Sequence, residues 1–117
     1  MQEPVFNSAS ESVCTAAQLE PRDMAVVARA GFRSVINNRP DGEGGPSQPS
    51  NDELRQAAEA LGLVYVYQPV DSGNIRPQDV AEFARLLSEL PTPVLAFCRS
   101  GARSRRLHDA AQANPAG

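Results

Sequence analysis

The chain has 117 residues, a net charge of −3 and 41% hydrophobic residues, which is an ordinary balance for one globular domain. No apolar run approaches the roughly 20 residues of a membrane span, and the N-terminus lacks the basic patch and apolar stretch of a secretory signal. We therefore predict a cytoplasmic protein without a membrane partner. All eleven basic residues are arginine, and four of them fall within the eight residues after Cys98. This clustering favours a small anion-binding pocket over the broad basic surface of a nucleic-acid-binding protein.

Helix-like and strand-like segments alternate along the chain. The first strand-like segment, "SVCTAAQL", is placed at an edge of the predicted sheet. Helices are predicted where proline or a capping box begins an amphipathic run and glycine or a turn ends it. These runs are residues 21–30, 51–61, 77–90 and about 103–113. Each of the first three is followed by a β-rich run, at residues 32–37, 63–70 and 93–98.

This alternation predicts an α/β fold with a mostly parallel sheet and helices on its faces. Right-handed crossovers bring the ends of the three strands to one edge of the sheet, where α/β proteins bind their ligands. The segments that leave these ends should therefore converge. The residues expected to become neighbours are Asn38, Arg39, Asp41, Asp71 and Cys98.

The segment "AFCRSGARS" takes Cys98 from an apolar strand into a turn that precedes a helix. Backbone N–H groups of such a turn, the helix N-terminus and the flanking Arg99 and Arg103 all favour a thiolate. Gly101 permits a tight turn, and Ser104 is predicted to donate a hydrogen bond to the sulfur. A buried structural cysteine is the simpler alternative. The position at a strand end and the two arginines favour a nucleophile instead.

Three stretches carry a resemblance to a known family: "AAQLEPRDMAVVARAGFRSVINNRPDGE", "AAEALGLVYVYQPV" and "PVLAFCRSGARS". From about Val13 to Leu107, the chain resembles the phosphatase-like domain of the bacterial beta-lactamase-hydrolase-like proteins. The resemblance implies a dual-specificity-phosphatase-like fold and a single catalytic domain over residues 1–117, either whole or one module of a longer protein. Members of this family are also described as sulfur transferases that act in company with persulfide-processing domains.

The spacing around Cys98 leaves two reactions open. Cysteine phosphatases resemble one another in the pattern His-Cys-x5-Arg followed by Ser or Thr, but here Phe97 replaces the His and Arg103 comes five places after the cysteine instead of six. Rhodanese-type sulfur transferases resemble Cys-Arg-x-Gly-x-Arg or Thr, a tighter loop that Cys98, Arg99, Gly101 and Arg103 fit at every fixed place.

Asp71, in contrast, favours phosphate ester hydrolysis. It lies after the preceding strand and resembles the general acid of dual-specificity phosphatases, which protonates the leaving oxygen. The string "DSGN" is also typical of a turn, so both roles stay open for Asp71.

Because the cysteine loop fits the sulfur-transferase pattern at every fixed place, we predict a sulfur transferase that holds a persulfide on Cys98. The alternatives are phosphate ester hydrolysis through a Cys98 phosphoenzyme with Asp71 as acid, and a non-catalytic domain that senses persulfide or docks to another enzyme. The expected partners are a small anionic substrate (a sulfane-sulfur donor such as thiosulfate, or a phosphate ester), a thiol acceptor and a fused or separate persulfide-processing enzyme. No cofactor is expected, and no metal, because two cysteines and one histidine lack zinc-ligand spacing. The predicted catalytic residues are Cys98, Arg103 and Asp71, and the predicted anion-binding residues are Arg39, Arg99, Ser100, Gly101, Ala102 and Ser104.

Four further side chains have weaker expectations. Arg39 is a candidate anion ligand and Asp41 a candidate partner for an arginine, although turn formation explains both. His108 is predicted to lie exposed on a polar helix. Cys14 is predicted to be a buried strand cysteine, with the resolution of a Cys98 persulfide as the alternative.

Overall fold

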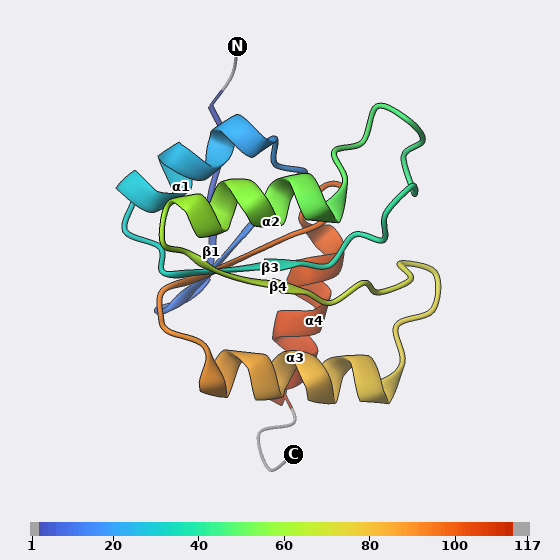
Figure 1. The fold of residues 1–117 in the computed structure, drawn as a ribbon. Helices are drawn as coiled ribbons and strands as arrows, with labels where there is room; N and C mark the ends of the chain where they lie inside the picture. Colours follow the sequence, from blue (N-terminus) through green and yellow to red (C-terminus); the bar gives the residue numbers. More distant parts are fainter. Residues whose placement is uncertain (1–2, 114–117) are drawn as a thin grey trace.

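A five-stranded sheet forms the centre of the molecule (Figure 1). The computed structural model describes residues 3–113. The strand order is β1-β2-β5-β3-β4, and β1 is antiparallel to β2 while the remaining neighbours are parallel. The strands are β1 (Asn7–Ser10), β2 (Val13–Ala16), β3 (Ser34–Asn37), β4 (Val64–Tyr67) and β5 (Val94–Phe97). The predicted mostly parallel α/β fold is confirmed.

The N-terminal strand differs from its expected place. Strand β2, which contains Cys14, lies between β1 and β5 and is therefore internal. The edge is formed by β1, because the polar segment "NSAS" folds back on β2 as a hairpin. Its residues are half-buried or exposed, so no hydrophobic run announces this strand in the sequence.

Helices cover both faces of the sheet. They are α1 (Met24–Arg29), α2 (Asn51–Ala60), α3 (Pro77–Glu89) and α4 (Ala102–Ala113), and a 3-10 turn at Pro21–Asp23 precedes α1. Figure 1 shows α1 and α2 on one side of the sheet and α3 and α4 on the other. The capping box predicted for α2 is present, since the Ser50 side chain accepts from the Glu53 N–H at 3.1 Å and the Glu53 carboxylate accepts from the Ser50 N–H at 3.2 Å.

Two hydrophobic clusters follow from the alternation of side chains along the strands. Leu95 and Phe97 of β5 face the cluster below α1 and α2, and Val94 and Ala96 face the cluster against α3 and α4. All four side chains are buried. The strand that ends at Cys98 is thus packed on both faces and paired on both edges, which fixes the position of the residue that follows it.

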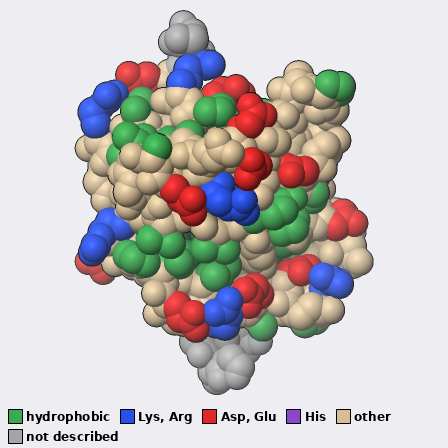
Figure 2. Space-filling view, in the orientation of Figure 1, with side chains coloured by type: hydrophobic (Ala, Val, Ile, Leu, Met, Phe, Trp, Pro, Cys, Tyr) green, Lys and Arg blue, Asp and Glu red, His purple; other side chains and the backbone are tan. Residues whose placement is uncertain are grey.

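The surface carries both signs of charge. On the face in Figure 2, basic and acidic side chains are interspersed, and a band of hydrophobic side chains lies between α2 and α3, where β4 forms the other edge of the sheet. Arg85 of α3 pairs with Glu82 and Glu89. None of the helices in the described part of the chain is long and apolar enough to cross a membrane.

Candidate active site

Cys98 sits at the junction of β5 and α4, the helix that begins four residues later. Its side chain is 1% exposed, and the Gly101 N–H donates a hydrogen bond to its sulfur at 3.1 Å. Gly101 has a φ of +96°, and a Cβ there would lie 3.4 Å from the backbone of Ala16. Only glycine adopts this conformation without strain, so the turn that aims the N–H at the sulfur depends on it.

The predicted hydrogen bond from Ser104 to the sulfur is wrong. The Ser104 hydroxyl donates to Oδ1 of Asn38 at 2.8 Å, because Ser104 points from the first turn of α4 toward the end of β3. The Asn38 amide in turn donates to the Gln68 carbonyl at 3.0 Å. This buried chain of hydrogen bonds joins α4 to the ends of β3 and β4.

Arg103 connects the three segments that were expected to converge. Its side chain is 5% exposed, and its Nη1 donates to the carbonyl oxygens of Asn38 and Val70 at 3.1 and 2.9 Å. Its Nη2 pairs with the Glu43 carboxylate at 2.9 Å. The Nε of Arg103 is buried and has no hydrogen-bond partner among the described residues. The Nε2 of His108 is likewise buried without a partner among residues 3–113.

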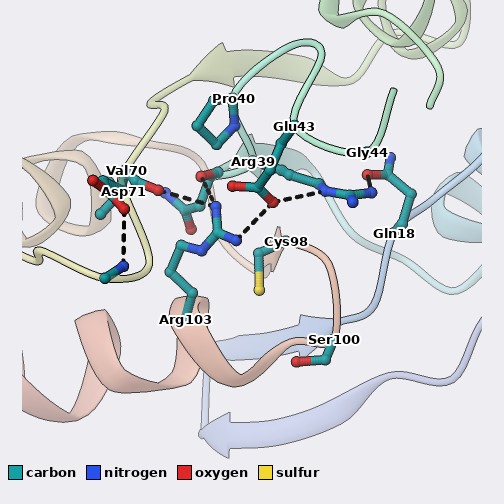
Figure 3. Close-up of polar contacts among 12 residues, drawn as sticks. Gln18, Arg39, Pro40, Glu43, Gly44, Val70, Asp71, Cys98, Ser100 and Arg103 are labelled. Atoms are coloured by element: carbon teal, nitrogen blue, oxygen red, sulfur yellow. Dashed lines mark hydrogen bonds and ion pairs between the residues drawn. The ribbon is translucent and has the colours of Figure 1, made fainter. Parts of the chain in front are cut away.

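Glu43 was missed by the sequence reasoning. One oxygen, Oε1, accepts from Nε of Arg39 and from Nη2 of Arg103, both at 2.9 Å, as Figure 3 shows. Burial acts to raise the pKa of the Glu43 carboxyl, but the hydrogen bonds and charges of Arg103 and Arg39 outweigh it and hold this pKa below its ordinary value. The available signal was an acidic residue four places after Arg39 in a glycine-rich loop.

The two aspartates of the site both accept hydrogen bonds from backbone N–H groups, Asp71 within a local turn and Asp41 across its loop. Asp71 is exposed, and its carboxylate accepts from the Gly73 N–H at 2.9 Å, as expected for the turn role of "DSGN". Asp41 does not hold an arginine in the described structure. It accepts from the N–H of Asn51 at 2.7 Å and so ties the loop to the start of α2.

Three arginines from two parts of the sequence line one pocket of about 490 Å3. Its walls are formed by Arg39, Glu43, Gly44, Ser72, Arg99 and Arg103. Cys98, being buried, is not among the lining residues. Ser100 and Ala102 are exposed, and Ser100 lines a separate pocket. Three arginine side chains and the Glu43 carboxylate thus face one pocket beside the cysteine loop, while the sulfur itself is buried.

Two expectations outside the pocket have different outcomes. His108 is 3% exposed, so its predicted exposure is wrong. Helix α4 packs against α3, β1 and β2 and thereby covers the ring, whose Nδ1 lies 3.0 Å from the Asp109 carboxylate. Cys14 lies in strand β2 as predicted, but it is half-buried rather than buried. Burial raises the pKa of its thiol, and its role in resolving a persulfide stays a prediction.

The sequence profile described as "beta-lactamase hydrolase-like protein, phosphatase-like domain" matches residues 6–115. The chain belongs to this family. It is 43% identical over 81 residues to the beta-lactamase hydrolase-like protein of Xylella fastidiosa, covering 69% of this chain and 19% of that protein. It is 36% identical over 99 residues to the protein of that name in Agrobacterium fabrum, covering 85% of this chain and 23% of that protein. This member of the family thus spans about a fifth of the length of these relatives.

Solved structures show the same fold. A candidate phosphatase of Neisseria meningitidis is 34% identical, with a TM-score of 0.84 over 91% of this chain and 75% of its own. The tyrosine phosphatase-like fold is also shared by TpbA of P. aeruginosa, at 16% identity and a TM-score of 0.61 over 82% of this chain and 54% of its own. The phosphatase-like fold implied by the resemblance is therefore confirmed, and the family is one of phosphatase-like cysteine domains.

Proposed function

We propose that the domain is a cysteine-dependent hydrolase of phosphate monoesters. The observation that carries the proposal is the buried guanidinium of Arg103, which follows the Cys98 loop and whose Nε has no partner among residues 3–113. The comparisons support this reaction over the sulfur transfer that the sequence favours, because the Neisseria relative is described as a candidate phosphatase. One structure of the fold neighbour TpbA, carrying a Cys-to-Ser change, is a complex with phosphotyrosine.

The proposed reaction has two steps. The Cys98 thiolate attacks phosphorus, the S–P bond forms, and the ester oxygen leaves with the bonding electron pair and a proton from Asp71. Water then attacks the phosphocysteine, the S–P bond breaks, and Asp71 takes back a proton as phosphate leaves. The Gly101 N–H supports the sulfur as an anion at 3.1 Å, while Arg103 and Arg99 hold the phosphoryl oxygens. No cofactor is needed.

For Asp71 to act as the acid, its carboxyl must leave the turn in which it accepts from the Gly73 N–H. The loop is suited to this change, since Asp71 is exposed and its neighbour Ser72 already lines the arginine pocket. We predict that Asp71→Asn lowers aryl phosphatase turnover by about 10²–10⁴-fold, most for poor leaving groups. An unchanged rate for a poor leaving group in a folded variant would exclude Asp71 as the acid.

Sulfur transfer is the second candidate, and the length of the loop favours it. Arg103 follows Cys98 by five places, and the sulfur accepts a single hydrogen bond among the described residues, from Gly101. Such a loop surrounds one sulfur atom more readily than three phosphoryl oxygens. In this reaction Cys98 attacks the outer sulfur of thiosulfate, the S–S bond breaks, and sulfite leaves with the electron pair. A thiol acceptor, in the same or a partner protein, then takes the sulfur from the persulfide.

One experiment separates the two reactions. The intact protein is exposed to an aryl phosphate or to thiosulfate, quenched rapidly in acid and weighed by mass spectrometry, with Cys98→Ser as the control. A phosphoryl group on the parent protein, absent from Cys98→Ser, supports hydrolysis. An added sulfur from thiosulfate, without phosphoryl transfer or aryl phosphate turnover, would replace the proposal by the second candidate.

A further inference from the structure

Glu43 lies where an oxyanion would bind in the arginine pocket. Its Oε1 bridges Arg39 Nε and Arg103 Nη2 at 2.9 Å each (Figure 3). The side chains of these arginines are only 10% and 5% exposed, whereas that of Glu43 is 28% exposed. The carboxylate thus reaches the buried guanidinium groups from the solvent side of the pocket.

The arginines are held in place by other groups as well. Arg103 keeps its two bonds to the carbonyls of Asn38 and Val70, and Arg39 Nη1 donates to the side chain of Gln18 at 3.0 Å. Neither guanidinium therefore depends on Glu43 alone for its orientation. If the Glu43 side chain turned away, the Nε of Arg39 and the Nη2 of Arg103 could donate to another anion.

Glu43 lies at the tip of a glycine-rich loop between β3 and α2. Gly42 and Gly45 flank it in the left-handed region, with φ of +78° and +83°, and both glycines are exposed or half-buried. The ends of the loop are tied, because the Asp41 N–H donates to the hydroxyl of Tyr67 and the Asp41 carboxylate accepts from Asn51. Within the tip, the Gly44 N–H donates to the Gln48 side chain at 2.7 Å and the Gln48 amide donates to the Pro40 carbonyl at 3.0 Å. Glu43 can therefore leave the arginines by turning its side chain while the loop backbone stays in place.

We propose that Glu43 holds the place of the substrate and that a dianionic oxyanion binds by displacing its carboxylate from Arg39 and Arg103. This inference rests on the anion-binding role given to the pocket above. A tethered carboxylate competes at a high effective concentration, so a free ligand must interact more strongly with the two arginines than a single negative charge does. Glu43 is then a specificity-determining residue that selects doubly charged groups, such as a phosphate monoester or thiosulfate, and rejects monoanions such as carboxylates and phosphate diesters.

The test is anion binding without turnover, measured by titration calorimetry on the parent chain and on Glu43→Gln. The probes are inorganic phosphate and sulfate as dianions and acetate as a monoanion. We expect Glu43→Gln to bind phosphate and sulfate at least about ten-fold more tightly, equivalent to about 1.4 kcal/mol. We also expect it to bind acetate measurably where the parent does not. The matched control is Asp52→Asn, which removes one charge from an exposed carboxylate that pairs with Arg55 and Gln56 on α2 and should leave all three affinities unchanged.

The outcomes distinguish this inference from the proposed function. Weaker phosphate binding by a folded Glu43→Gln protein would show that Glu43 positions the arginines. Equal binding would show that Glu43 does not compete with the anion. Either result overturns the proposed displacement of Glu43 and leaves the anion site intact. If phosphate binds neither protein, the anion site and the proposed function are both wrong. Thermal melts of each variant, with Glu43→Ala as a second substitution, separate a loss of binding from a loss of folding.

Discussion

Replacing Arg103 by lysine should destabilise the domain, because a single ammonium group cannot reproduce the contacts of the guanidinium. Arg103 makes two hydrogen bonds to backbone carbonyls, those of Asn38 and Val70, and an ion pair with Glu43. Lysine keeps the charge and can retain about one of these contacts, which leaves two buried acceptors without a donor. Each loss costs about 1–1.5 kcal/mol. The expected fall in the free energy of unfolding is therefore about 2–3 kcal/mol, or roughly 10 °C in Tm.

Urea denaturation followed by circular dichroism measures this change, with the slope m compared to that of the parent. Arg105→Lys is the matched control, since Arg105 lies two residues further along α4 with its side chain 46% exposed and pairs with Asp109 at 3.0 Å. Its substitution should cost less than about 0.5 kcal/mol. If Arg103→Lys unfolds within 0.5 kcal/mol of the parent, where ~1 kcal/mol is the ordinary worth of one such bond, Arg103 does not hold the strand ends together.

Two further predictions concern helix ends. Ser50→Ala should cost about 1 kcal/mol because it removes the side-chain acceptor of the Glu53 N–H, and Ser50→Gly only a few tenths; urea midpoints that do not differ between these variants and the parent would contradict the role of the cap. The side-chain hydrogen bond from Arg76 lowers the pKa of Asp79 below its usual value although the residue is buried, so this carboxylate stabilises the fold fully above its unfolded pKa and loses that contribution as pH falls through the folded pKa. We expect Asp79→Asn to flatten part of the acid loss of stability between about pH 5 and pH 2, and a pH profile with unchanged slope would argue against it.

The sequence was most informative where one physical signal acted alone. The capping box in the sequence indicates the helix that begins at Asn51. Four consecutive apolar residues before Cys98, all buried in the structure, indicate β5. The hairpin strand β1 was not predicted, because its polar residues pair through the backbone and give no hydrophobic pattern. The prediction that His108 is exposed was wrong because the sequence indicated a polar helix, whereas the packing of α4 buries the side of the helix that carries His108.

The candidate site shows the same division. Convergence of the strand ends followed from topology alone, and Arg103 does contact both Asn38 and Val70. The partner of a flexible polar side chain could not be read in the same way. Ser104 had the sulfur and Asn38 as possible acceptors, and Glu43 lies on a glycine-rich loop whose path the sequence does not determine.

Cys98 follows the central strand of the sheet, whereas Glu43 belongs to a loop whose interior contributes little to the core. The strand that positions Cys98 and the loop that carries Glu43 therefore differ in how freely they can be altered. Between Asp41 and Ser50 the loop can be shortened, extended or exchanged while the anchors at Tyr67 and Asn51 are retained. On the roles proposed for Glu43 and Cys98, such grafts would change which anions bind in the arginine pocket while leaving the proposed nucleophile untouched.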